Sequence, residues 1–309
     1  MTCKILTPQQ AGEQLPAMVA AIGNLDGVHL GHQALIAEAK SLADQQGAPL
    51  AVISFEPHPK RYFDPDALPS RLSPAVHKAE LLGQFGVDAL INVPFTRDTA
   101  TMAAEAFVEE LLVNCIGVKT LVAGPDFRFG KQRKGDLHMA NRLGLPAYSI
   151  EWQQIDGEAI SSSRIRAALR LGDVDQAHAM LGHAYEVRGL VDRGDQLGRT
   201  IGFPTANVDT AGYCVPMDGI YAAWADLGDG RDRWPTALYV GKRPSVDGFN
   251  QRFEAHLLDF DGNLYGQELK VTLESFVRGD MALDGLDALK AQIERDCAAC
   301  RAVLMNEHL

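Results

Sequence analysis

Two histidines near the start of the chain are placed to handle phosphate. His29 and His32 lie three residues apart in the run Gly23-Asn24-Leu25-Asp26-Gly27-Val28-His29-Leu30-Gly31-His32. Two donor side chains aimed at one phosphate can stabilise the charge that builds in a transition state, without a covalent intermediate. This run, the signature loop, predicts a site for a nucleoside triphosphate with His29 and His32 as candidate catalytic residues.

The elements on either side of the signature loop would position these groups. Met18 to Ile22 is a short apolar run that predicts a buried strand, and the stripe Leu35, Ala39, Leu42 and Ala43 predicts a helix after the loop. Gly31 and His32 then fall in the first helical turn, where free backbone N–H groups and the helix dipole attract phosphate. Glycines let an anion approach the main chain closely. The candidate nucleotide-binding residues of this region are Gly23, Asn24, Asp26 and Gly31.

The signature loop resembles that of the His-x-Gly-His nucleotidyltransferases. Its Asp-Gly-Val-His form is similar, more specifically, to bacterial bifunctional riboflavin kinase/FAD synthetase. That family usually has phenylalanine where this chain has Leu25, an exchange of one apolar residue for another.

Length and composition favour a two-domain enzyme. The 309 residues exceed the size at which one core normally keeps growing, and 46% hydrophobic residues suffice for two cores. A net charge of −11 argues against a nucleic-acid partner, although local basic loops can still hold a small phosphate ligand.

The chain carries no sign of a membrane partner or of secretion. No apolar run approaches the roughly 18 residues that span a bilayer, and the amino terminus does not read as a signal peptide. The five cysteines are scattered apart from Cys297 and Cys300, so we expect reduced thiols and a cytoplasmic location. The pair Cys297 and Cys300 could suggest redox or zinc chemistry, but the sequence has no second Cys/His pair that would complete a zinc site. Both cysteines continue a helical apolar stripe, which favours their packing in the core.

Residues 1–183 alternate β-rich runs with helical stretches, the pattern of a parallel sheet covered on both faces. We therefore expect an N-terminal Rossmann-like α/β domain, with its ligands at the carboxyl ends of the strands. The predicted strands are Met18 to Ile22, Ala51 to Phe55, Ala89 to Val93, Thr120 to Gly124 and Ala147 to Ile150.

Two loops at that edge carry further candidates. The prolines of Phe55-Glu56-Pro57-His58-Pro59 predict an extended loop that presents His58, a candidate flavin contact. The segment from Gly124 to Gly130, followed by Lys131, Arg133 and Lys134, could close over a nucleotide or be a solvated basic loop. In the resembled family this segment binds ATP, which implies that Asp126 contacts the nucleotide.

The segment Ile160-Ser161-Ser162-Ser163-Arg164-Ile165-Arg166 follows the fifth strand and predicts the start of a helix to about Leu171. Serines are ordinary helix caps. Three of them with two arginines add hydroxyl donors and positive charge to the positive end of a helix dipole, which suits a triphosphate. The segment resembles the family's Ser-Ser-Ser/Thr-x-x-Arg element, which implies Ser162, Ser163 and Arg166 as triphosphate contacts.

Composition changes after Leu181-Gly182-His183, and we place the domain boundary there, giving residues 1–183 and 184–309. The second domain is expected to be a small antiparallel β-barrel with a terminal helix from about Leu286, suited to plugging or covering a barrel end. Its predicted strands are Glu186 to Val191, Gly219 to Ala225, Thr236 to Val240, Arg252 to Asp259 and Glu268 to Phe276, and the predicted helix face is Leu286, Leu289, Ile293, Cys297, Cys300 and Leu304.

The stretch from Gly198 to Asn207 ends with the hydroxyl of Thr205 and the side-chain amide of Asn207, two residues apart. Because extended residues two apart point the same way, Thr205 and Asn207 could place two neutral oxygens on one Mg²⁺. Water and ATP phosphates would take the remaining positions, as magnesium sites prefer. A buried polar turn is the alternative, since Thr and Asn are common turn residues.

The order of motifs in this half resembles that of the riboflavin kinase domain, so the resemblance covers essentially the whole chain. The motifs are Pro204-Thr205-Ala206-Asn207, Gly219-Ile220-Tyr221-Ala222, Glu254-Ala255-His256-Leu257 and Leu264-Tyr265-Gly266. The resemblance implies that Glu254 is the general base on the ribityl 5′-hydroxyl and that Thr205 and Asn207 hold a metal-bound phosphate.

No P-loop motif occurs, but the loop from Gly194 to Gly202 could close over nucleotide, which makes Gly198 a candidate contact. Arg278 is expected near flavin. Leu283 stands where the family commonly has phenylalanine.

The resemblance implies a bifunctional enzyme that phosphorylates riboflavin to FMN in its C-terminal domain and adenylylates FMN to FAD plus pyrophosphate in its N-terminal domain. Both steps would use Mg²⁺ and ATP, and the expected partners are riboflavin, FMN and ATP, with the oligomeric state left open. One alternative is a nucleotidyltransferase for another phosphate acceptor with a flavin-binding, non-catalytic C-terminal domain. Others are a flavin-binding carrier and an enzyme with one active half.

Overall fold

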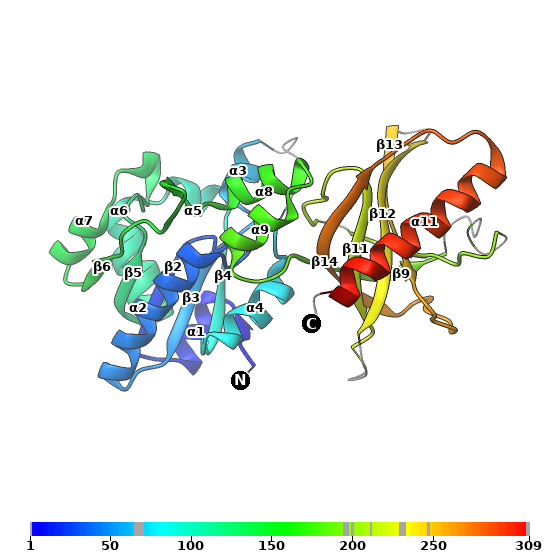
Figure 1. Ribbon diagram of the computed structural model, residues 1–309. Helices are drawn as coiled ribbons and strands as arrows, with labels where there is room; N and C mark the ends of the chain where they lie inside the picture. The colour runs from blue at the N-terminus through cyan, green and yellow to red at the C-terminus, as the bar shows by residue number, and fades with distance from the viewer. Residues whose placement is uncertain are drawn as a thin grey trace. The chain divides into compact units, whose positions relative to one another are not determined.

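The computed structural model describes residues 2–64, 71–193, 198, 201–210, 212–228, 233–245 and 248–306 (Figure 1). The chain divides into two compact units, Met1–Ser162 and Ser163–Leu309. The division falls at the start of α8 (Ser162–Arg170), earlier than the expected boundary after residue 183. Helix α9 (Val174–Leu181) contacts strand β14 (Glu268–Gly279), which explains why these helices group with the second unit.

The first unit is built on a six-stranded parallel sheet in the order β1-β4-β3-β2-β5-β6, as the alternating pattern predicted. The strands are β1 (Lys4–Leu6), β2 (Met18–Ile22), β3 (Leu50–Glu56), β4 (Ala89–Pro94), β5 (Val118–Ala123) and β6 (Ala147–Ser149). Sequence analysis missed β1, which is only three residues long.

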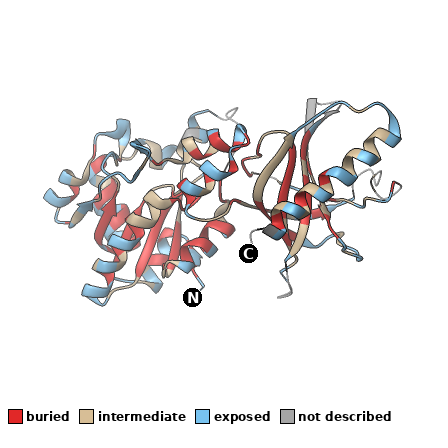
Figure 2. Ribbon diagram, in the orientation of Figure 1, coloured by how far each residue is buried: buried red, intermediate tan, exposed pale blue. Residues whose placement is uncertain are grey.

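Both faces of this sheet are buried (Figure 2). In β2, Val19 and Ala21 belong to one apolar cluster and Ala20 and Ile22 to the other, because successive strand residues face opposite sides. The helical segments of this unit are α1 (Pro8–Gln14), α2 (Leu30–Gln46), α3 (Pro59–Phe63), α4 (Ala75–Gln84), α5 (Arg97–Thr101), α6 (Ala104–Ala106), η1 (Phe107–Ile116), η2 (Lys131–Arg133) and α7 (Leu137–Arg142).

A two-stranded hairpin, β7 (Gln154–Ile155) and β8 (Glu158–Ala159), stands between β6 and α8. The serine-rich segment follows the fifth predicted strand, as expected, but sequence analysis did not predict the hairpin that lies between them. The turn Asp156-Gly157 has positive φ at both residues, the geometry that two-residue hairpins favour.

The second unit contains a closed antiparallel barrel in the order β10-β13-β12-β11-β14-β9, which confirms the predicted barrel. Its strands are β9 (Glu186–Asp192), β10 (Ala206–Val208), β11 (Gly219–Asp226), β12 (Trp234–Ser245), β13 (Gly248–Leu257) and β14. Strand β10 was not predicted. It is only three residues long, contains Asn207 and begins directly after Thr205, the two residues that the sequence singled out as a metal site.

The terminal helix α11 (Gly285–Asn306) packs on the outer face of the barrel. Its buried residues Cys300 and Leu304 contact the cluster that contains Ile220, Ala222 and Ala237. Alternate residues such as Tyr221 and Leu238 fill the interior instead, so the expectation that this helix plugs or covers a barrel end was wrong. Within the described ranges, none of the helices has both the length and the apolarity of a membrane span.

Candidate active sites

The predicted histidine pair forms a stacked arrangement at the start of α2. His29 is the N-cap residue and His32 lies in the first turn, with ring centroids 3.5 Å apart and ring planes at 19°. Burial, followed by the charges of His29 and Lys78, holds the pKa of His32 well below its ordinary value of 6.5. His32 is therefore neutral near pH 7, and its buried Nδ1 has no hydrogen-bond partner among the described residues. A neutral imidazole can still donate one N–H to a phosphate.

Asp26 organises the signature loop. Its carboxylate accepts the backbone N–H groups of Leu72 (3.0 Å) and Ser73 (2.9 Å), while the Gly27 N–H donates to Ser73 Oγ (2.8 Å). The Ser162 hydroxyl donates to the Asp26 carbonyl (2.9 Å). Asp26 thus joins the signature loop to a neighbouring loop, and its contact with nucleotide stays a prediction.

The loop after β3 meets the signature loop through His58. The Nε2 atom of His58 lies 3.0 Å from Nδ2 of Asn24. The two glycines allow close packing: a Cβ on Gly23 would lie 2.9 Å from Leu25, and one on Gly31 would lie 3.2 Å from the His29 ring. The structure therefore brings His58 to Asn24 of the signature loop and packs Gly31 against the His29 ring.

Three other predicted nucleotide contacts lie outside the signature loop and the loop after β3. Asp126 is exposed on the loop after β5 and forms no hydrogen bond or ion pair with any residue in the described ranges. Ser163 and Arg166 lie in α8, on the second unit. Their roles stay predictions.

Lys78 of α4 is a member of the first site that sequence analysis missed. Its ammonium group donates to the Asn24 carbonyl (2.6 Å) and to Ser54 Oγ of β3 (3.3 Å). The residue is only 6% exposed. Lysines are mostly exposed in proteins, so no sequence pattern pointed to Lys78 as a site residue.

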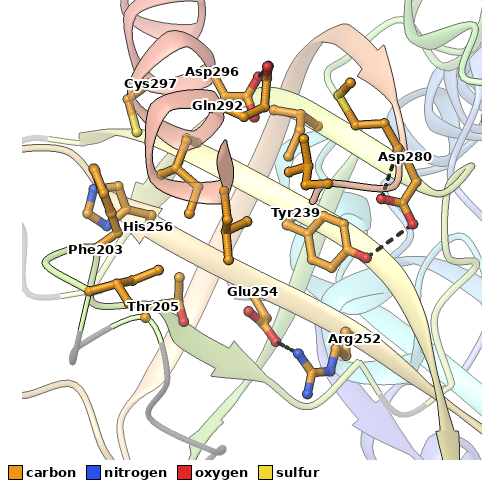
Figure 3. Close-up of a pocket in the computed structure, with 18 of the residues that line it drawn as sticks. Phe203, Thr205, Tyr239, Arg252, Glu254, His256, Asp280, Gln292, Asp296 and Cys297 are labelled. Atoms are coloured by element: carbon orange, nitrogen blue, oxygen red, sulfur yellow. Dashed lines mark hydrogen bonds and ion pairs between the residues drawn. The ribbon is translucent and has the colours of Figure 1, made fainter. Parts of the chain in front are cut away.

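A pocket of about 590 Å³ lies between the outer face of the barrel and α11 (Figure 3). The predicted residues Gly198, Thr205, Asn207, Glu254 and Arg278 all line this outer-face pocket. Apolar residues from the first half of α11, Leu286, Leu289 and Ile293, line it too. The pocket thus joins polar groups from the barrel to an apolar side from the helix.

Strand register explains why residues far apart in the sequence meet here. Asn207 pairs with Glu254, Glu254 with Tyr239, Tyr239 with Ile220, and Ile220 with Arg278. These five residues form one row across five strands, and all line the pocket. In β12 and β13 the chain neighbours of Tyr239 and Glu254 face the other side, into the barrel, because strand side chains alternate.

Glu254 also pairs with a charged residue two positions earlier on its own strand. Its carboxylate pairs with Arg252 at 2.8 Å, and the two side chains are 17% and 30% exposed (Figure 3). Nδ1 of His256 lies 2.7 Å from the Pro204 carbonyl and so fixes the backbone beside Thr205. Sequence analysis missed Arg252, whose pairing depends on the same strand alternation that presents Glu254.

Gly198 allows the backbone to approach Thr205 closely. A Cβ there would lie 2.3 Å from the Phe203 carbonyl oxygen and 3.3 Å from Thr205 Oγ1. The Phe203 N–H donates to the Gly198 carbonyl (2.8 Å). The other residues of 194–200, including those predicted to close over nucleotide, lie outside the described residues.

Arg278 is held by α11. Its Nε and one terminal nitrogen donate to the two oxygens of Asp296 (2.8 and 2.6 Å), and Gln292 donates to the same carboxylate (2.8 Å). This hydrogen-bonded pairing raises the pKa of the Arg278 guanidinium. Nearby, the Tyr239 hydroxyl donates to Asp280 (3.4 Å). Burial of Tyr239, and after it the negative charge of Asp280, raise the pKa of the Tyr239 hydroxyl.

Comparison with known proteins identifies both halves. Residues 12–164 match the family model described as FAD synthetase, and residues 181–304 match the one described as riboflavin kinase. A crystal structure from Streptococcus pneumoniae, described as a macrolide-efflux protein, aligns with a TM-score of 0.85 and 28% identity over 96% of this chain and 98% of its own.

Curated relatives cover almost the whole chain. The bifunctional riboflavin kinase/FMN adenylyltransferase of Pseudomonas fluorescens is 39% identical over 290 residues, covering 92% of each chain. The protein of the same name from Escherichia coli K12 is 40% identical over 282 residues, covering 90% of each. The chain belongs to the family of bifunctional riboflavin kinases/FMN adenylyltransferases.

Proposed function

We propose that the chain catalyses two ATP-dependent reactions: it phosphorylates riboflavin to FMN, and it adenylylates FMN to FAD with release of pyrophosphate. The observation that carries this proposal is the presence of two chemically different sites, the stacked histidines of one unit and the Glu254 row of the other. A nucleotidyltransferase with a non-catalytic C-terminal half would leave the second site without a use.

We assign adenylyl transfer to residues 1–183 and the kinase to residues 184–309, which the ranges of the two family models support. We also place the enzyme in the cytoplasm, since no disulfide links its cysteines in the described structure. Riboflavin, FMN and ATP are its small-molecule partners.

In the kinase reaction, Glu254 accepts the proton of the riboflavin 5′-hydroxyl as that oxygen attacks the γ-phosphorus of ATP, the bond from this phosphorus to the β,γ-bridging oxygen breaks, and ADP leaves. Such a transfer needs in-line positioning, neutralisation of phosphate charge and a proton acceptor. Thr205 and Asn207 present neutral oxygens to the pocket that Glu254 lines, a donor set of the hard kind that Mg²⁺ prefers. They would hold a phosphate-bound Mg²⁺, which neutralises phosphate charge when bound. Gly198 lets the loop backbone approach the nucleotide.

In the adenylyl transfer, the FMN phosphate is already a competent nucleophile. His29 and His32, with the first-turn N–H groups of α2, orient ATP and stabilise the charge that develops at the α-phosphorus. Gly23, Asn24 and Gly31 shape this site, and Asp26 positions the loop. We further propose that Asp126, Ser162, Ser163 and Arg166 contact ATP, and that His58 contacts flavin.

One assay tests the whole proposal. The purified protein is incubated with Mg-ATP and either riboflavin or FMN, and the products are separated by chromatography. Riboflavin should give both FMN and FAD, and FMN should give FAD. FMN as the sole product, or no flavin nucleotide at all, would contradict the proposal.

Magnesium dependence should follow Thr205. Chelation of divalent cations should abolish FMN formation, and Thr205→Ala should raise the Mg²⁺ concentration needed for half-maximal FMN formation about tenfold or more, the scale of losing one group at a metal site. Thr210→Ala, just beyond β10, is the matched control and should behave as wild type. An unchanged Mg²⁺ requirement in Thr205→Ala would remove Thr205 from the metal site.

Asp296 should govern riboflavin binding through α11. Asp296→Asn should raise the KM for riboflavin about tenfold with little change in the KM for ATP, because Arg278 loses its charged partner and no longer holds the helix over the pocket. If Arg278 acts through this pairing, adding Arg278→Gln to Asp296→Asn should have little further effect. Additive effects would instead indicate direct contact between Arg278 and flavin.

A further inference from the structure

Lys78 lies on the buried side of α4. It belongs to the first turn, where its N–H donates to the Pro74 carbonyl (2.8 Å), and its neighbours Ala79 and Leu82 pack in the apolar core. A helical position of this kind is ordinarily apolar. From it the Lys78 side chain reaches both the end of β3, at Ser54, and the signature loop, at Asn24.

The charge of Lys78 is not balanced by an ion pair. Among the described residues no carboxylate lies within ion-pair distance of its ammonium group. The two acidic groups that act on the charge of Lys78 have other partners, since Asp26 accepts backbone N–H groups and Glu56 pairs with Arg71. A buried charge without a counter-ion is costly, and methionine would fill the same space without that cost. An anion bound at the signature loop would supply the missing counter-charge.

We propose that Lys78 is a positioning residue of the adenylyl-transfer site, which fixes the signature loop at Asn24 and supplies positive charge behind the histidine pair for the ATP triphosphate. This inference rests on the proposed function. Lys78 acts through its hydrogen bond to the loop backbone and through the electrostatic field of its positive charge. It needs no contact with the reacting atoms.

Electrostatics around Lys78 supports this role. Its charge is one cause of the lowered His32 pKa, so it helps to keep that ring neutral. Burial lowers the pKa of Lys78 itself to about 8. The charge of Asp26 opposes this shift, the charge of Arg71 adds to it, and the charge of Glu56 opposes it. The groups that act on Lys78 or respond to it are Asp26, Glu56, Arg71 and His32. Lys78 therefore loses its proton as the pH rises through about 8.

The test measures FAD formation from FMN, as kcat/KM for ATP, across pH 6.5 to 10. Lys78→Met should lower this value at pH 7 about tenfold to a hundredfold, the scale of losing a group that orients a site. Lys78→Arg should retain most of it. In wild type the value should fall above about pH 8, and in Lys78→Arg the fall should move to higher pH because arginine stays protonated. Lys40→Met, an exposed lysine on α2, is the matched control and should equal wild type.

Riboflavin phosphorylation by the same preparations corrects for general alkaline effects, and thermal melting shows whether Lys78→Met folds. A folded Lys78→Met with wild-type kcat/KM would overturn the inference. If that variant does not fold, coincident pH profiles of wild type and Lys78→Arg would overturn it, and a shifted profile would support it. Failure of wild type to make FAD from FMN would overturn the proposed function as well, whereas the preceding outcomes leave that function standing.

Discussion

His32→Ala should lower FAD synthesis from FMN by about 10² or more, the scale of losing one transition-state donor. The ring stacks on His29 in the first turn of α2 and is neutral near pH 7, so it can donate one N–H to the α-phosphate without carrying charge. FMN formation should be unaffected, because the kinase pocket belongs to the other unit. Both rates are measured on one preparation, with FMN or riboflavin as substrate.

The matched control is His138→Ala, which removes an exposed histidine of α7 and should leave both rates unchanged. FAD synthesis at the wild-type rate in folded His32→Ala would refute the role of the histidine pair.

Glu254→Gln should abolish riboflavin phosphorylation while FMN is still converted to FAD. Glutamine keeps the shape of the side chain but cannot accept the proton of the 5′-hydroxyl, a role that is typically worth 10²–10⁴ in rate. The loss should appear in kcat more than in the KM for riboflavin, because proton transfer occurs only in the transition state. Steady-state kinetics of FMN formation checks this.

Glu268→Gln, an exposed carboxylate on β14, is the control for Glu254→Gln and should retain full kinase activity. Equal loss of FMN and FAD formation in Glu254→Gln would mean that the two reactions are not divided between the two units.

Local pattern predicted the position of the histidine pair well. An apolar strand, a glycine-containing turn and a helical stripe together dictate where His29 and His32 lie, and all three depend on residues close in the sequence. The same reasoning placed Thr205 and Asn207 on one side of an extended segment, and both line the pocket.

Partners brought together by tertiary contacts could not be predicted in this way. The pairing of Arg278 with Asp296 depends on which face of the barrel α11 covers, and the apolar stripe of α11 fits an outer face as well as a barrel end. Lys78 looks like a surface residue in sequence, and only the packing of α4 buries it. Asp26 was predicted only as a nucleotide contact, and its structural role, accepting two backbone N–H groups of another loop, could not be seen in the sequence.

The central claim is that two separate sites in one chain act in succession, with FMN as the product of one and the substrate of the other. It is tested most directly by mixing His32→Ala and Glu254→Gln with riboflavin and Mg-ATP and measuring FAD. Neither variant alone should form appreciable FAD from riboflavin, and the mixture should, because FMN released by the first is adenylylated by the second. A mixture that forms no more FAD than the two variants separately, or a single variant that forms it at the wild-type rate, would contradict the account.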